Sequence, residues 1–151
     1  FFIGNGGSAA TASHFANDIG VGTNTYQKPF RAVSLVDNVA ILTAIGNDYG
    51  YDEIFSRQLR IQARKRDVLV GISASGNSMN LVEAFEYARA NQIYTVALTG
   101  FDGGKLRSIA DHTVHVPTEM KEYGPSEDAH MILDHLVGSY LMRKVLSERT
   151  L

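Results

Sequence analysis

The chain has 151 residues, of which 44% are hydrophobic and 20% are charged, and its formal net charge is −2. This length and composition suit one domain with a substantial core and argue against long disorder. The slight negative charge argues against a nucleic-acid-binding surface, which needs a strongly basic face. The absence of cysteine excludes disulfides and thiolate metal sites and fits a cytoplasmic location, and no apolar run approaches the roughly 20 residues that span a membrane.

Short apolar runs alternate along the chain with longer stretches of helical periodicity. In chain order the predicted elements are strand 1–4, helix 8–19 with Ser8 as its N-cap, strand 32–35, helices 38–44 and 52–63, strand 67–73, helix 80–91, strand 94–98, helix 104–110, strand 113–116 and helix 127–147. The strands are continuously apolar rather than alternating. This combination predicts an α/β fold in which a parallel sheet is covered on both faces.

Two loops that follow predicted strands are rich in glycine and serine. They have the sequences GNGGSAA (residues 4–10) and SASGNS (residues 73–78). In open parallel sheets, ligands bind outside the carboxyl ends of the strands, where both loops are expected. Glycine lets the backbone approach a ligand, free N–H groups at a helix start attract phosphate, and serine hydroxyls add donors. The loops therefore predict a phosphate site, although a tight strand-to-helix turn also explains either loop alone.

Neither loop has a nucleotide-binding pattern. Residues 4–7 lack the third spaced glycine of a dinucleotide site, and no glycine-rich loop ends in Gly-Lys-Ser or Gly-Lys-Thr. We therefore expect the phosphate to belong to a small metabolite.

Histidines and carboxylates recur on the first and last predicted helices. His14 and Asp18 are four residues apart and share one helix face. Glu127 and His135 lie about 80° apart around the last helix, and Asp134 is closer still to the direction of Glu127. If the two helices converge, these groups offer imidazoles and carboxylates for one divalent metal or for proton transfer. A surface ion pair is the simpler explanation of either pair alone.

Together these segments resemble the sugar isomerase (SIS) domain family, and within it the phosphoheptose isomerase branch. The matching stretches are GNGGSAATASHFANDI, LTAIGNDYGYDEIFSRQL, DVLVGISASGNSMNLVEA, TVALTGFDGGKL and EDAHMILDHL. The resemblance implies a doubly wound, flavodoxin-like α/β fold with a five-stranded parallel sheet and helices on both faces. It also implies that residues 1–151 form a single SIS domain, that a helical segment precedes Phe1, and that the protein assembles as a homotetramer.

The implied activity is the interconversion of sedoheptulose 7-phosphate and D-glycero-D-manno-heptose 7-phosphate. Carried over by position, the substrate-binding residues are Asn5, Gly6, Ser8, Ser73, Ser75, Ser78 and Asp102. The implied catalytic residues are Asp18, Glu127 and His135. The implied zinc ligands are His14, Asp18, Glu127 and His135.

Three positions depart from the family pattern. Asp18 stands where the family has its catalytic glutamate and is shorter by one carbon–carbon bond of about 1.5 Å. Glu127 stands where the family has glutamine, so the longer carboxylate comes from the other helix if the two changes compensate. Gly22 replaces an arginine that contacts substrate. These departures leave open a subgroup that acts on another phosphosugar.

An aldose–ketose isomerisation moves a proton between C1 and C2 and needs a base near the carbon and an acid for the carbonyl oxygen. Asp18 or Glu127 is the predicted base, and His135 is the predicted acid. Three or four nitrogen and oxygen ligands favour a mid-series divalent ion such as zinc, which would polarise the carbonyl.

Two other classes of protein remain open. A non-catalytic scaffold branch of the family lacks the last-helix histidine, whereas His135 is present here. A phosphosugar-sensing module usually accompanies a DNA-binding domain, and this chain is not basic enough for one. The expected partners are therefore a phosphorylated sugar and further copies of the chain, without nucleic acid or membrane.

Overall fold

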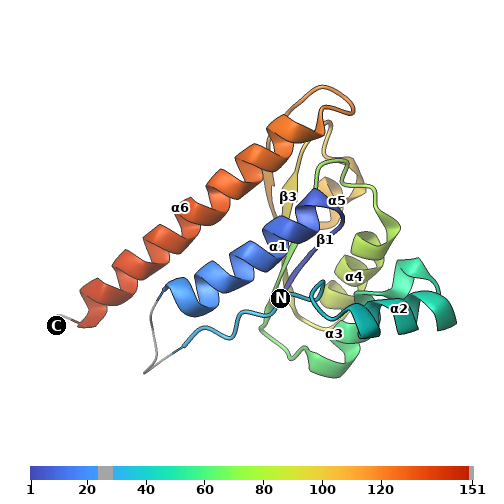
Figure 1. Cartoon of the computed structure of the whole chain (residues 1–151), viewed down its shortest axis with the longest axis horizontal. Helices are drawn as coiled ribbons and strands as arrows, with labels where there is room; N and C mark the ends of the chain where they lie inside the picture. Colours follow the sequence, from blue (N-terminus) through green and yellow to red (C-terminus); the bar gives the residue numbers. More distant parts are fainter. Residues whose placement is uncertain (24–28, 150–151) are drawn as a thin grey trace.

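The computed structural model of the chain describes residues 1–23 and 29–149. There, four parallel strands form one sheet in the order β1-β2-β3-β4, and helices lie on both of its faces (Figure 1). The strands are β1 (Phe2–Gly4), β2 (Val68–Ser73), β3 (Tyr94–Thr99) and β4 (His112–His115). The helices are α1 (Gly7–Asn17), the π-helix η1 (Asp18–Gly22), α2 (Val39–Asp48), the 3-10 helix η2 (Tyr51–Glu53), α3 (Ser56–Gln62), α4 (Met79–Ala90), α5 (Gly104–Ile109) and α6 (Tyr123–Arg149).

The prediction of five strands is wrong, because the sheet has four strands in the described residues. Residues 32–35 form a single parallel bridge in which Ser34 pairs with Phe2. The N–H of Phe2 donates to the carbonyl of Val33 (2.9 Å), and the N–H of Leu35 donates to the carbonyl of Phe2 (3.0 Å). The same strand pairs with β2 over three residues on its other edge, whereas residues 35–37 bend directly after the bridge and end the pairing.

The bridge nevertheless preserves the expected order of segments. Phe2 pairs with Ser34 on one edge of β1 and with Val70 of β2 on the other. If residues 32–35 are counted as the second segment, the five segments lie in the sheet in the order 2-1-3-4-5, as in a flavodoxin-like fold. The direction in which the chain adds segments to the sheet reverses between β1 and β2. The other predicted elements are present with shifted ends, except that the helix expected at 52–63 is divided into η2 and α3.

Strand side chains divide between two cores on opposite faces of the sheet. Ile3 and Leu69 pack with α3 and α4 side chains in one core, whereas Phe2 and Ile72 pack with α1 side chains in the other. Successive strand residues point to opposite faces, so a strand covered on both faces is apolar throughout. This arrangement confirms the two-sided coverage predicted from the apolar strands. Among the described helices, none is long and apolar enough to cross a membrane.

Helices α1 and α6 lie against each other and run in the same direction on one face of the sheet (Figure 1). A Cβ added to Gly7 at the start of α1 would lie 2.5 Å from Oε1 of Glu127. Further along, a Cβ added to Gly138 would lie 3.5 Å from the Cβ of Asp18. We call this line of contact the α1–α6 seam.

A glycine in β2 provides a test of the core on the α4 face. A Cβ at Gly71 would lie 2.3 Å from Cε2 of Phe85, whose side chain is fully buried. Gly71→Ala should therefore lower the free energy of unfolding by about 1–3 kcal/mol, measured by urea denaturation. Gly124→Ala is the control, because a Cβ there meets no atom within 4 Å. Equal stability of the two variants would contradict this packing.

Candidate active site

The two glycine-rich loops meet in a pocket of about 330 Å³. It lies at the carboxyl ends of β1 and β2, where the direction of the sheet order changes and open α/β sheets bind ligands. Residues from the start of α6 close one side of it. The lining residues are Asn5, Gly6, Gly7, Ser8, Ile72, Ser73, Ala74, Ser75, Ser78, Tyr123 and Glu127. The structure therefore brings together six of the seven predicted substrate-binding residues.

The serine loop turns tightly and keeps its hydroxyl protons available. Gly76 has a φ of 63°, and a Cβ there would lie 2.0 Å from the carbonyl oxygen of Gly103, so the turn requires glycine. The hydroxyl oxygens of Ser73 and Ser75 accept hydrogen bonds from the N–H groups of Gly76 (3.1 Å) and Asn77 (3.3 Å). Because each oxygen acts as an acceptor within the loop, its O–H can donate to an anion in the pocket.

Helices α1 and α4 both begin at this pocket. Their N-cap residues, Gly6 and Ser78, provide no side-chain cap to the first-turn N–H groups. The prediction that Ser8 caps α1 is wrong, because Gly6 takes the N-cap position and Ser8 lies inside the first turn. Uncapped N–H groups and two helix dipoles attract an anion. Since the lining contains no lysine or arginine, the backbone supplies the positive potential for a phosphate.

Asn5 is fixed in the pocket by two side chains that the sequence analysis missed. The Nδ2 of Asn5 donates to Oδ1 of Asn80 (3.0 Å), and the Nδ2 of Asn80 donates back to Oδ1 of Asn5 (2.9 Å). The hydroxyl of Tyr51 donates to the same Asn5 oxygen (2.9 Å). Asn80 is buried at the second residue of α4. In the sequence, the available signal was an asparagine two residues after the serine loop and directly before the apolar Leu81 and Val82.

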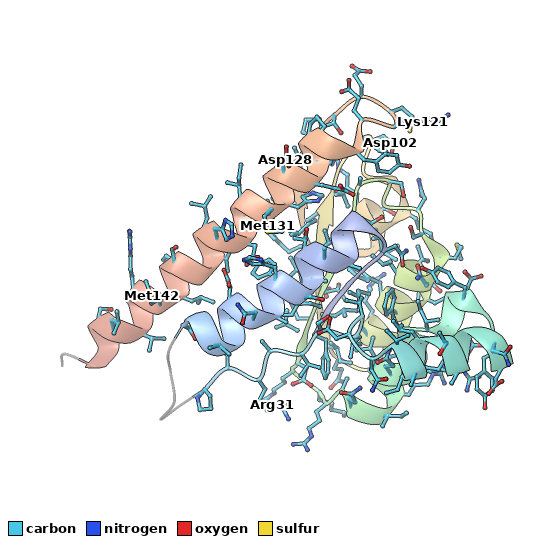
Figure 2. The ribbon with its side chains drawn as sticks, in the orientation of Figure 1. Arg31, Asp102, Lys121, Asp128, Met131 and Met142 are labelled. Carbon is cyan, nitrogen blue, oxygen red and sulfur yellow. The ribbon has the colours of Figure 1, made fainter. Side chains whose placement is uncertain are left out.

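Asp102 does not line the pocket. Its Oδ1 accepts a hydrogen bond from the N–H of Gly104 (3.1 Å), and its carbonyl accepts one from Arg107 (3.2 Å). It lies near the loop that leads into α6 (Figure 2). The neighbouring Phe101 contacts the same loop, because its N–H donates a hydrogen bond to the hydroxyl oxygen of Thr118 (3.2 Å). Within one chain Asp102 thus stabilises the start of α5, and its contact with substrate stays a prediction.

A second polar group, the α1–α6 cluster, lies further along the seam. It consists of His14 on α1, Asp18 at the start of η1, and Asp134 and His135 on α6. Each of the four places one ligand-type atom within 4.8 Å of the others. The Nε2 atoms of the two histidines are 3.2 Å apart, and Nε2 of His14 is 3.6 Å from Oδ1 of Asp18. Three of the four predicted metal-binding residues therefore converge.

Glu127 is the predicted ligand that lies elsewhere. It lines the phosphate pocket, where its carboxylate is against Gly7. Glu127 and Asp134 are seven residues apart, so they share a face of α6 but are separated by about 10 Å along its axis. The sequence prediction compared directions around the helix and not this axial rise. Asp134 occupies the place in the cluster that was predicted for Glu127.

Asp134 is a buried carboxyl group without a hydrogen-bond partner among the described residues. Its relative exposure is 0%, and neither carboxylate oxygen is paired. Burial and then the negative charge of Asp18 raise the pKa of Asp134 from its ordinary 3.8 to about 6, while His14 and His135 oppose the shift. Such a group is stabilised either by keeping its proton or by pairing with a cation.

His130 lies one turn before Asp134 and is also fully buried. Neither of its ring nitrogens makes a hydrogen bond within the described parts of the chain. Burial lowers the pKa of His130, with the backbone of Thr99 acting in the opposite direction. The ring is therefore neutral near pH 7 and packs beside the cluster without belonging to it.

The donor set of the cluster fits a divalent metal of the zinc type. Imidazole nitrogen and carboxylate oxygen are both common zinc ligands. Two carboxylates balance the charge of a dication, and the unpaired oxygens of Asp134 are the kind of buried group that needs one. His14, Asp18, Asp134 and His135 are therefore the residues that can hold such an ion.

Comparison with known proteins gives one consistent family. Residues 1–100 match the family model described as SIS domain. The phosphoheptose isomerase of Akkermansia muciniphila is 43% identical over 145 residues, which cover 95% of this chain and 75% of that protein. The probable phosphoheptose isomerase of Thermoplasma acidophilum is 39% identical over 142 residues, which cover 94% of this chain and 77% of that protein.

Solved structures give the same result. The structure of a phosphoheptose isomerase from Neisseria gonorrhoeae matches with a TM-score of 0.81 and 41% identity, covering 92% of this chain and 73% of that chain. The structure of a phosphoheptose isomerase from Francisella tularensis matches with a TM-score of 0.83 and 28% identity, covering 93% of this chain and 74% of that chain. The overall fold therefore has counterparts of known structure.

The raised pKa of Asp134 predicts how the stability of the metal-free protein changes with pH. The folded state holds its proton up to about pH 6 and the unfolded state only to 3.8, so stability falls as the pH rises between these values. Between pH 4.5 and pH 7.5 the loss is about 2 kcal/mol. Asp134→Asn should remove this loss in urea denaturation at pH 4.5 and 7.5 with chelator. Asp128→Asn, an exposed change on α6 (Figure 2), should keep it; the same pH dependence in both variants would refute the assignment.

Proposed function

This chain belongs to the SIS domain family, in its phosphoheptose isomerase branch, and we propose that it is an aldose–ketose isomerase of a phosphorylated sugar. The proposed pair is sedoheptulose 7-phosphate and D-glycero-D-manno-heptose 7-phosphate, with residues 1–151 as one SIS domain. The shared name of its relatives supports this reaction. The observation that carries the proposal is that an anion pocket and a cluster of imidazoles and carboxylates occupy one seam between two helices.

The spacing of these two parts suits a long sugar phosphate. On α6, Glu127 lines the pocket and Asp134 belongs to the cluster. These two residues are about 10 Å apart along the helix axis. Eight bonds separate C1 from phosphorus in an open-chain heptose 7-phosphate, and an extended chain with bonds near 1.5 Å covers about 10 Å. With its phosphate at the serine loop, such a sugar lies along the seam and reaches the cluster with C1 and C2. A three-carbon sugar phosphate ends well short of it.

The cluster contains the acid and the base that the reaction needs. Asp18 is the proposed base, because its side chain is 26% exposed and accessible to a sugar on the seam. It takes the proton from one carbon of the C1–C2 pair and returns it to the other. His135, also exposed, gives a proton to the carbonyl oxygen and takes one back from the neighbouring hydroxyl, which becomes the new carbonyl. Glu127, the other predicted base, lies nearer the phosphate and is placed to contact the sugar hydroxyls.

Zinc is the proposed metal of the cluster. Mixed imidazole and carboxylate donors favour a mid-series divalent ion over calcium or magnesium. When bound, the ion would polarise the substrate carbonyl. Without the ion, the proton of His135 would do so. The cytoplasmic location stays a prediction from the cysteine-free composition.

The proposed assembly is a homo-oligomer, with a tetramer as the predicted state. Helix α6 extends beyond the sheet (Figure 1) and carries the exposed apolar side chains Ile132, Leu136 and Tyr140 at intervals of four residues. An apolar stripe of this kind marks a protein-interaction surface. Because the stripe lies on the helix that carries His135, a second copy packed on it would border the active site.

The isomerase is tested with metal-replete protein and sedoheptulose 7-phosphate in a coupled assay. Asp18→Asn should lower kcat at least about 100-fold, because it removes the base. Ser75→Ala should raise KM about 10-fold with a smaller change in kcat, since it removes one phosphate donor. Ser147→Ala, whose hydroxyl bonds only within α6, should match the unaltered protein. Absence of turnover by the unaltered protein would favour the scaffold alternative.

The assembly is tested by light scattering after size exclusion. Tyr140→Glu places a charge in the apolar stripe and should convert the tetramer into smaller species at micromolar concentration. Ser139→Glu adds the same charge at an exposed neighbouring position and should leave the mass unchanged. A monomeric unaltered protein, or equal masses for both variants, would contradict the proposed surface.

A further inference from the structure

We infer that Asp134 is the buried ligand of the metal site, in the role that the sequence pattern gives to Glu127. Asp134 binds the ion together with His14 and His135, and Asp18 completes the donors as the exposed carboxylate that substrate can reach. The inference deepens the proposed function and rests on its metal-binding cluster. It adds a ligand that the resemblance does not imply.

The distances in the cluster match a tetrahedral site. Metal–ligand bonds of 2.0–2.2 Å in a tetrahedral zinc site place neighbouring donor atoms about 3.3 Å apart. Nε2 of His14 is 3.2 Å from Nε2 of His135 and 3.6 Å from Oδ1 of Asp18. One oxygen of Asp134 and one donor atom from each of the other three residues lie within 4.8 Å of one another. Small side-chain rotations are thus enough to surround one ion.

The unpaired groups of the cluster also call for a cation. Two imidazole nitrogens that face each other at 3.2 Å repel unless a proton or a cation lies between them. Both oxygens of the fully buried Asp134 have no hydrogen-bond partner among the described residues. A neutral tautomer can satisfy the imidazole pair and a separate proton can neutralise Asp134, but neither joins the two groups. A divalent ion binds the imidazoles and Asp134 at once and balances the two carboxylates.

Glu127 does not join the cluster in this structure. The donor atoms that lie within 4.8 Å of one another come from His14, Asp18, Asp134 and His135, and Glu127 is placed about two turns of α6 before Asp134. Its carboxylate lies at the start of α1, against Gly7. The remaining alternative for Asp134 is a buried, permanently protonated side chain that only fills space.

Zinc calorimetry on chelator-treated full chain separates these possibilities. We expect the unaltered protein to bind one zinc ion per chain. Asp134→Asn should weaken binding at least about 100-fold, because it removes a directly bound ligand. Glu127→Gln, the matched control at the other end of the seam, should change the affinity less than about 3-fold. Weaker binding by Glu127→Gln alone, unchanged binding by Asp134→Asn, or no zinc bound by the unaltered protein would each overturn the inference.

Two further measurements separate ligand loss from misfolding and from failure of the proposed activity. Thermal unfolding without metal should show Asp134→Asn to be at least as stable as the unaltered protein, and Asp134→Ser serves as the second variant if it is not. The visible absorption of bound Co²⁺, which reports the coordination geometry, should change in the Asp134 variants and not in Glu127→Gln. Because neither readout uses substrate, an inactive protein that shows this metal pattern contradicts the isomerase proposal and leaves the role of Asp134 supported.

Discussion

The parallel packing of α1 against α6 assembles the α1–α6 cluster and brings Glu127 to the pocket at the start of α1. α1 follows directly from β1, so its start is fixed at the carboxyl edge of the sheet. α6 is fixed at the same edge through the buried Ser126. Its hydroxyl forms a hydrogen bond with the hydroxyl of Thr118 (2.7 Å). It also packs so closely on Gly100 that a Cβ there would lie 2.2 Å from the Oγ of Ser126. Two helices anchored at one edge and running side by side necessarily bring equivalent turns together. That register places the phosphate pocket at one end of the seam and the α1–α6 cluster two turns beyond it.

The two ends of the seam have opposite electrostatic character. The pocket attracts an anion through two helix N-termini, whereas the cluster concentrates carboxylates that attract a cation. A separation of about 10 Å weakens the repulsion between a bound phosphate and the cluster carboxylates several-fold relative to contact distance. Glu127 is the exception, because its carboxylate lies at the start of α1. There it interacts favourably with the helix dipole of the free protein and repels an arriving phosphate.

Local patterns predicted those parts of the site that depend on one segment of sequence. The strand, glycine and serines of residues 67–78 form a pattern that needs no distant partner, and the i, i+4 spacing put His14 and Asp18 on one face. The opposition of His14 to Asp134 and His135 depends instead on the Ser126 anchor, which joins segments far apart in sequence. Asn80 was missed for the same reason, because its partner Asn5 is 75 residues away. The prediction of a fifth strand was wrong because the chain bends at residues 35–37, directly after one bridge to β1.

Asp134 connects stability with the candidate chemistry. A fully buried carboxyl group with no hydrogen bond is costly in a folded chain, and nothing in the packing of α6 alone requires it. Its position is explained if the free energy lost on burial is recovered when a cation binds, since ligands that bind only the folded state stabilise it. Asp18 begins a π-helical turn, a feature often found at functional sites, and its carboxylate faces Gly138 of α6. Asp18 therefore lies where the backbone departs from regular α-helix, and Asp134 lies where burial of its carboxyl group is unfavourable. Both features are expected where a site is maintained at the expense of stability.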